Sequence, residues 1–118
     1  MTHAVTVASV MSPAMLTVFA QSPIDSARMI FADHRVHVLP VVDPDGKPIG
    51  FVTPRDVLHE ARAIRDVMTP FALDVPAETP LVIAARLMVF GGFSHLPVVD
   101  DEGCVVGILS AFDVRDRV

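Results

Sequence analysis

The sequence predicts an α/β (α+β) fold built from two copies of one unit, each a small β-sheet with flanking helices. The chain of 118 residues matches itself without a gap at a constant offset of 57 residues. Each copy carries a helical pattern of apolar residues, followed by two β-branched runs joined by a short turn sequence. Two copies of one unit usually pack about a pseudo-twofold axis, so a cleft between them is expected to occur twice.

The internal match includes turns and polar residues as well as apolar positions. Met11 matches Met68, and Pro23 matches Pro80. The segment Leu-Pro-Val-Val-Asp stands at 39–43 and again at 96–100, and the pattern Gly-x-x-Thr/Ser-x-x-Asp stands at 50–56 and again at 107–113. We therefore assign residues 1–61 to the first copy and residues 62–118 to the second. Each half is too short to bury an adequate core by itself, so we expect the two copies to form one folding unit.

A short strand and a helix open each copy. Residues 16–18 are an extended run, and Ser22 and Thr79 each precede a proline, a pattern typical of an N-cap followed by proline at the first helical position. Glycine tolerates the left-handed conformation of a helix C-cap, so the second helix is predicted to end at Gly91-Gly92. The first helix is predicted to end near His34-Arg35, where the sequence has no glycine. Apolar residues recur at helical spacing in both copies, at Ile24, Ala27, Ile30 and Phe31 and at Leu81, Ala84, Leu87 and Met88.

A hairpin and a polar corner close each copy. The runs 38–42 and 49–52 flank an Asp-Gly turn, and the second copy repeats this arrangement. After the hairpin, Thr53 or Ser110 is placed to cap a helix whose first turn holds Asp56 or Asp113. This corner brings a hydroxyl, a carboxylate and free backbone N–H groups together, so it is the candidate site. The charged, alanine-rich stretch 55–65 is expected to hold a helix and a linker.

Composition narrows the class of protein. Hydrophobic residues make up 52% of the chain, yet no apolar run approaches the roughly 18 residues of a membrane span, so we expect no membrane segment. We expect a second subunit to cover the excess apolar surface instead. The N-terminus has no signal-peptide pattern, and Cys104 has no other cysteine in the chain with which to form a disulfide. Both observations indicate a cytoplasmic protein. A net charge of −5 repels nucleic acid, whereas a small phosphorylated ligand responds only to local charges.

The sequence motifs of the two copies, in their order and spacing, resemble those of the cystathionine β-synthase (CBS) domain family from about Ala8 to Val114. The resemblance implies two tandem CBS motifs, which together form a Bateman module of two small sheets with helices on their outer faces. It also implies clefts between the motifs that bind adenosine-containing ligands, and a homodimer shaped as a flat disc. The motifs that carry the resemblance are Val10-Met11-Ser12-Pro13, Leu39-Pro40-Val41-Val42-Asp43, Gly50-Phe51-Val52-Thr53-Pro54-Arg55-Asp56-Val57 and their second copies.

The resemblance assigns ribose contacts to Thr53 with Asp56 and to Ser110 with Asp113. Such an assignment is chemically reasonable, because a carboxylate can accept hydrogen bonds from both ribose hydroxyls. The position just before the acid often contacts phosphate in the family. It is Arg55 in the first copy and Phe112 in the second, so the two clefts are expected to differ in strength.

Family modules build each cleft from both copies. The Thr53 site is therefore expected to take its base pocket from Met68, Phe93 and Ser94. One further position, often basic in the family, is Val38 in the first copy and His95 in the second. The Ser110 site is expected to combine with Met11, Val36 and His37, of which His37 offers a partner for phosphate.

These patterns favour a regulatory module that senses AMP, ADP, ATP or an S-adenosylmethionine type of ligand and signals by a change of conformation or assembly to an unidentified target protein. The alternative is a dimerising interaction module with vestigial clefts, in which each acid is only part of a helix cap. A metal site is not expected, because His34 and His37 have no third ligand at fitting spacing. Nor do we expect an enzyme or a catalytic cofactor, since the chain offers no evident nucleophile with its base.

Overall fold

The computed structural model describes residues 5–115, which fall into two compact units. The first unit is residues 16–71. The second unit comprises residues 5–15 and 72–115 of the described chain. Each unit holds one four-stranded sheet and its own hydrophobic cluster.

The first unit has the sheet order β2-β3-β4-β5. Strand β2 (Val18–Phe19) runs parallel to β3 (Leu39–Val42), and helix α1 (Ile24–Asp33) connects them. Strand β4 (Pro48–Val52) pairs antiparallel with β3 as a hairpin and antiparallel with β5 (Thr69–Pro70) on its other side. Two single turns of 3₁₀ helix, η2 (Asp56–Leu58) and η3 (Ile64–Asp66), lie between β4 and β5 in the chain.

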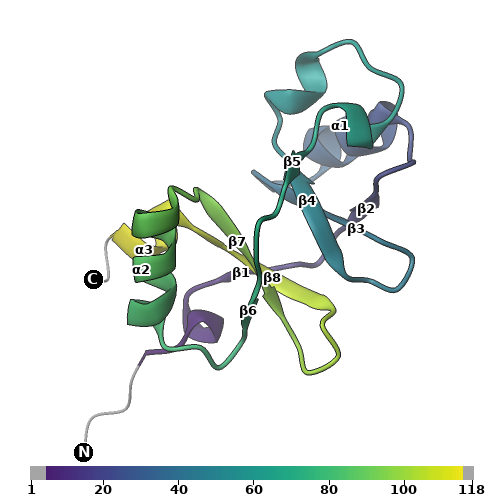
Figure 1. Cartoon of the computed structure of the whole chain (residues 1–118). Helices are drawn as coiled ribbons and strands as arrows, with labels where there is room; N and C mark the ends of the chain where they lie inside the picture. The colour runs from purple at the N-terminus through teal and green to yellow at the C-terminus, as the bar shows by residue number, and fades with distance from the viewer. Residues whose placement is uncertain (1–4, 116–118) are drawn as a thin grey trace, which may run out of the picture. The chain divides into compact units, whose positions relative to one another are not determined.

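The second unit repeats this arrangement with the sheet order β1-β8-β7-β6 (Figure 1). Its elements are η1 (Val7–Ser9), β1 (Ser12–Pro13), β6 (Val75–Pro76), α2 (Leu81–Gly91), β7 (His95–Val99), β8 (Val105–Ser110) and α3 (Ala111–Arg115). Strands β6 and β7 are parallel and flank α2 in the chain, while β7 and β8 form the hairpin. The predicted α+β class, with two small sheets and their helices, is confirmed.

Each sheet is completed by the opening strand of the other repeat. Strand β5 belongs to the second repeat but pairs with β4, and β1 belongs to the first repeat but pairs with β8. The close approach of these edge strands explains one glycine in each hairpin. A Cβ at Gly50 would lie 2.7 Å from the carbonyl oxygen of Thr69, and one at Gly107 would lie 2.9 Å from that of Ser12. The compact units are thus a different division of the chain from the sequence repeats.

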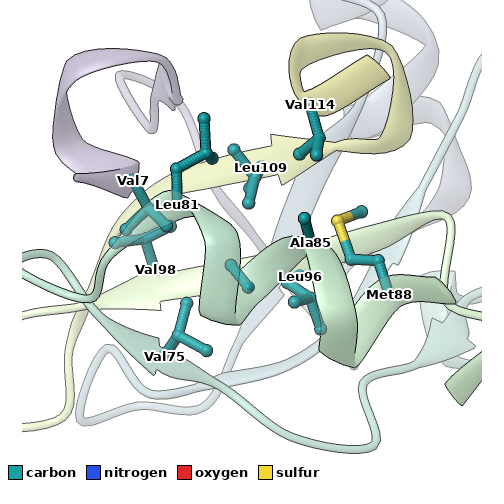
Figure 2. Close-up of a cluster of buried hydrophobic side chains, with 10 residues drawn as sticks. Val7, Val75, Leu81, Ala85, Met88, Leu96, Val98, Leu109 and Val114 are labelled. Carbon is teal, nitrogen blue, oxygen red and sulfur yellow. The ribbon is translucent and has the colours of Figure 1, made fainter. Parts of the chain in front are cut away.

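A closely packed apolar core supports the second unit. Figure 2 shows Leu81, Ala85 and Met88 of α2 gathered with side chains from the sheet, such as Leu96 and Leu109. Leu96 and Leu109 are almost completely buried. Burying a side chain of this kind contributes about 1.5–3 kcal/mol relative to leaving it in water. The first unit has the equivalent cluster, formed by Val18, Ala20, Ile24, Ala27, Leu39, Val41, Val52, Val57 and Ile64.

Both helices begin one residue later than predicted, so the expectation that Ser22 and Thr79 cap them is wrong. The N-cap residues are Pro23 and Pro80, and neither helix has a side-chain cap. Backbone carbonyls replace the missing hydroxyls: the N–H of Ile24 donates to Arg62 at 3.1 Å, and that of Leu81 donates to Val5 at 2.7 Å. The predicted end of α2 is confirmed, since Gly92 is the left-handed C-cap with φ of 71°.

The stretch 55–65 holds no regular α-helix, contrary to expectation, but only the 3₁₀ turn η2 followed by loop and the start of η3. Hydrogen bonds from Arg28 of α1 explain why the helical turn η2 does not continue beyond Leu58. Its guanidinium donates from Nε to the carbonyl oxygen of Val57 at 2.8 Å and from Nη2 to that of His59 at 3.2 Å. Those carbonyls are therefore tied to α1 instead of to amides of a continuing helix. Within the described residues, no helix has the length and apolar character needed to cross a membrane.

Candidate functional site

The end of β4 places Thr53 and Asp56 in direct contact in the first unit. Asp56 Oδ2 accepts hydrogen bonds from the backbone N–H of Thr53 at 2.8 Å and from its Oγ1 hydroxyl at 3.0 Å. The Asp56 N–H in turn donates to the Thr53 carbonyl at 3.0 Å, which closes the turn that starts η2. Both residues are half-buried, whereas Arg55 between them is exposed. The local backbone thus fixes the carboxylate and leaves the arginine in solvent.

The end of β8 makes the matching corner in the second unit. Asp113 Oδ2 accepts from the N–H of Ser110 at 2.9 Å, and the N–H of Asp113 donates to Ser110 Oγ at 3.2 Å. This reciprocal pair caps α3, so the predicted capping role is present here. In both units the acid accepts these bonds through Oδ2. A carboxylate offers about four lone-pair positions, so each acid keeps acceptor capacity beyond these bonds.

A histidine joins the corner in the second unit alone. His95 stands directly opposite Ser110 in the β7–β8 register, and its Nδ1 lies 3.0 Å from Ser94 Oγ. The Ala111 N–H donates to the Ser94 carbonyl at 2.9 Å, which ties the start of α3 to the start of β7. Burial lowers the pKa of His95 below its ordinary value of 6.5, and the negative charge of Asp113 partly opposes that shift. The equivalent residue of the first repeat, Val38, cannot titrate.

An apolar groove of ≈570 Å³ lies within the second unit, between residues of α2 and α3. It brings Phe93 and Ser94, two of the predicted site residues, beside Ala85, Val89 and Val114. Its lining is mostly apolar, which suits a flat apolar group better than a phosphate.

Arg115 also lines this groove, and its guanidinium carbon lies 4.6 Å from the centre of the Phe112 ring, a cation–π contact. Sequence reasoning did not select Arg115. The only signal for it was its spacing of one helical turn from Phe112, which is also common on ordinary solvated helix surfaces.

Two further predicted residues, Met68 and Met11, lie against the glycines of the hairpins. Met68 Sδ would be 3.1 Å from a Cβ at Gly50, so it stands in the first unit with Thr53 and Asp56. Met11 contacts the position of Gly107 in the second unit, which also holds Ser110 and Asp113. Each methionine therefore belongs to the unit of the acid with which it was grouped.

The remaining predicted residues lie in the other unit from the acid assigned to them. Phe93 and Ser94, grouped with Thr53, are part of the second unit, together with His95. Val36 and His37, grouped with Ser110, are part of the first unit, where Val36 packs on the core and His37 is exposed. The expectation that each cleft takes residues from both copies stays a prediction.

Comparison with known proteins identifies the repeat. The family model described as CBS domain matches residues 7–63 and again residues 64–118. The osmoprotectant import ATP-binding protein OsmV of Salmonella typhimurium is 31% identical over 101 residues, which cover 86% of this chain and 26% of OsmV. The chain spans about a quarter of the length of the curated relatives it matches first.

Solved structures agree with the match in fold. CBSX2 from Arabidopsis thaliana is 30% identical, with a TM-score of 0.77 over 97% of this chain and 94% of CBSX2. CBSX2 has also been crystallised in complex with AMP. A further CBS domain pair, crystallised with 5′-methylthioadenosine and S-adenosyl-L-methionine, is 28% identical with a TM-score of 0.78 over 95% of this chain and 98% of that chain.

Proposed function

This chain belongs to the CBS domain family, with two CBS domains in tandem, and from that premise we propose that it is a regulatory module that binds an adenosine-containing ligand such as AMP, ADP, ATP or S-adenosylmethionine. Relatives of similar fold and length have been crystallised with AMP or with S-adenosyl-L-methionine. Their identities of 28–31% to this chain support a shared class of ligand.

The observation that carries the proposal is the pair of fixed acids. Asp56 and Asp113 occupy the same position in two corners, and each is held rigidly through Oδ2 by the residue three positions earlier. Because each carboxylate is already held in place, it can accept hydrogen bonds from both ribose hydroxyls with little further loss of side-chain conformational entropy on binding. We propose that these acids bind the ribose of the ligand, and that Arg55 binds the phosphate of a ligand at the site of Thr53 and Asp56.

Binding acts on shape or assembly and involves no catalysis. A ligand shifts a conformational equilibrium only by its differential affinity for the two states, so the contacts from a corner to the ligand signal when they are stronger in one state than in the other. The large apolar side chains exposed on the helices, such as Phe90 with 86% of its surface in solvent, support a homodimer. We place the protein in the cytoplasm, where its single cysteine, Cys104, would stay reduced. The target protein that receives the signal is a separate partner.

Thermal-shift titration with AMP, ADP, ATP and S-adenosylmethionine tests the ligand class. A ligand that binds only the folded state raises its stability, by about 2.7 kcal/mol at a hundred times Kd. We expect at least one of the four to raise the melting temperature in a saturable manner. A flat response to all four, at concentrations up to the millimolar range, would overturn the proposal.

The second candidate is an interaction module with vestigial clefts. It is favoured by Phe112, which stands where a phosphate-binding residue is expected and is 71% exposed. It is also favoured by the capping bonds, which already give both acids a structural role. Light scattering that shows a stable dimer, combined with no thermal shift by any adenosine compound, would select this function over ligand sensing.

A further inference from the structure

We propose that Arg28 of α1 is a positioning residue for the ligand corner of the first unit, although it lies outside that corner. By holding the turn η2, it keeps the Asp56 carboxylate in the orientation in which it accepts the ribose hydroxyls. This inference rests on the proposed function and names the residue on which the affinity of one of its two sites depends. The second repeat has Ala85 at the equivalent position, so the two corners are held in different ways.

The guanidinium of Arg28 contacts the backbone directly after Asp56. Its Nε donates to the carbonyl oxygen of Val57 at 2.8 Å, and its Nη2 donates to that of His59 at 3.2 Å. A third bond, from Nη1 to Asp25 at 2.9 Å, stays within α1. The planar guanidinium carries several N–H donors in a fixed geometry, so one side chain can make all three bonds together. Arg28 therefore connects α1 to the end of η2.

The turn η2 has little to hold it in place by itself. It is a single turn of 3₁₀ helix, and its own backbone bonds are long: the Leu58 N–H lies 3.2 Å from the Arg55 carbonyl oxygen, and the His59 N–H lies 3.4 Å from that of Asp56. A single helical turn fixes several dihedral angles for few hydrogen bonds, so its stability comes mostly from tertiary contacts. The two bonds from Arg28 and the one buried side chain of η2 are contacts of this kind.

The internal repeat shows that the second unit holds its acid in another way. Arg28 corresponds to Ala85, and Val57 corresponds to Val114. An alanine side chain has no donor for a backbone carbonyl, and both Ala85 and Val114 belong to the apolar cluster of Figure 2. Asp113 instead lies in α3, a regular α-helix that is closed at its start by the reciprocal cap described above. The first corner is thus braced by a neighbouring helix, whereas the second is held by its own helix.

A loosely held turn would lower the affinity of the first corner. When only a fraction of the molecules has the binding-competent conformation, the apparent Kd rises by the reciprocal of that fraction. If loss of the bonds from Arg28 left η2 ordered in about one-tenth of the molecules, a ligand would bind about tenfold more weakly at Asp56. The bonds between Asp56 and Thr53 lie at the start of η2 and do not replace the contacts at its end.

The same connection works in the opposite direction. A coupling free energy between two parts of a protein is reciprocal. A ligand that orders η2 therefore also favours the bonds between η2 and α1, and a change in α1 that breaks these bonds weakens the ligand. Binding at the first corner thus acts on α1 through a side chain for which the second repeat has no counterpart.

Isothermal titration with AMP and with adenosine tests this role one site at a time. Asp113→Ala leaves only the first corner intact, and Asp56→Ala leaves only the second. In the Asp113→Ala background, Arg28→Ala should weaken binding about fivefold to twentyfold. In the Asp56→Ala background, it should leave binding unchanged. AMP and adenosine should lose affinity equally, because Arg28 acts through the acid that binds ribose and does not contact the phosphate.

Two further variants separate position from charge. Arg65→Ala removes the same charge from an exposed position on η3 of the same unit, and it should bind AMP as its parent does. Arg28→Lys keeps the charge but has no planar fork for two carbonyls, so it should also weaken binding. It takes the place of Arg28→Ala if circular dichroism shows that the alanine variant is unfolded.

Hydrogen exchange measured by mass spectrometry adds a readout that needs no ligand. Peptides that cover residues 53–59 should exchange faster in Arg28→Ala than in the wild type, because the end of η2 opens more often. Peptides that cover residues 110–115 should exchange at the rate of the wild type. Unchanged exchange in 53–59 would overturn the brace whether or not a ligand binds.

The outcomes separate this inference from the proposed function. Unchanged affinity of Arg28→Ala in the Asp113→Ala background would overturn the positioning role and leave ligand sensing standing. An equal loss at both corners, or a loss for AMP without a loss for adenosine, would also overturn it. Binding that is confined to the second corner in the wild type would do the same. A wild type that binds neither compound would count against the proposed function itself.

Discussion

Asp56→Ala removes the acid that we assign to ribose, and its effect can be worked out from the contacts in the first unit. Asp56 Oδ2 holds the N–H of Thr53 at 2.8 Å and its hydroxyl at 3.0 Å. Losing a capping acceptor of this kind costs roughly 0.5–2 kcal/mol of folding stability. For a chain of 118 residues, 1 kcal/mol corresponds to a fall in Tm of roughly 4 °C. The variant should therefore fold and melt a few degrees lower.

The loss in ligand affinity should be larger than the loss in stability. Hydrogen bonds to a charged group contribute about 1.5–3 kcal/mol each. If Asp56 accepts bonds from both ribose hydroxyls, its removal should weaken binding at that site by at least about 2 kcal/mol, or roughly 30-fold in Kd. Isothermal titration with AMP measures this change. The experiment uses protein well below its melting temperature, so that partial unfolding does not lower the apparent affinity.

Asp66→Ala is the matched control in the same unit. Asp66 Oδ2 accepts the N–H of Ala63 at 3.2 Å, so it bonds the backbone three residues earlier, as Asp56 does with Thr53. It belongs to no predicted ligand site. We expect Asp66→Ala to lower Tm by a similar amount while its affinity for AMP equals that of the wild type. Equal affinities in Asp56→Ala and Asp66→Ala would refute the ribose assignment and leave Asp56 as a helix cap alone.

Three further predictions test other parts of the structure. Gly50→Ala should destabilise the protein by about 1–3 kcal/mol in urea unfolding, because its Cβ meets the Thr69 carbonyl of β5; a stability equal to the wild type would contradict this close approach. The pKa of His95 is lowered, so the unfolded chain binds more protons and stability should fall as pH drops below about 6.5. His95→Val should reduce this dependence between pH 7.5 and 5.5, and an unchanged slope would contradict it. Arg55→Gln should weaken AMP binding roughly threefold to tenfold and leave adenosine binding unchanged; equal losses for both ligands would argue against a phosphate contact.

Much of the fold could be predicted because each element leaves its own local signal. The hairpin turns are an example: Asp43 Oδ1 accepts the N–H groups of Asp45 and Lys47, and Asp100 Oδ1 repeats this with Glu102 and Cys104. An aspartate side chain that bonds backbone two and four residues later is a local device that the sequence pattern reveals directly. The same is true of Gly92, whose left-handed conformation ends α2.

Features that depend on distant partners could not be predicted. Strands β1 and β5 are two residues long and contain proline, so they carry no alternating pattern, and only the pairing with β8 and β4 shows to which sheet each belongs. The prediction of caps at Ser22 and Thr79 was wrong for the same reason. The acceptors that replaced them, Arg62 and Val5, lie far away in sequence.

The candidate site shows the same division. The closeness of Thr53 and Asp56 follows from their spacing of three residues and was predicted, whereas the bond between their side chains was not. The placement of Ser94 and His95 beside Ser110 arises from the register of β7 against β8, which periodicity does not specify. The groove that contains Phe93 and Arg115 depends on how α3 packs against α2, and this packing has no signature in the sequence of either helix.

The most direct test of adenosine sensing is calorimetric titration of wild type and of the double variant Asp56→Ala/Asp113→Ala with AMP, ATP and S-adenosylmethionine. The proposed function predicts saturable binding of at least one ligand to the wild type, with one or two sites per chain, and no measurable binding to the folded double variant. Affinity that survives in the double variant would contradict the assignment of the site to these two acids. Absence of heat with all three ligands in the wild type would contradict the sensing function itself.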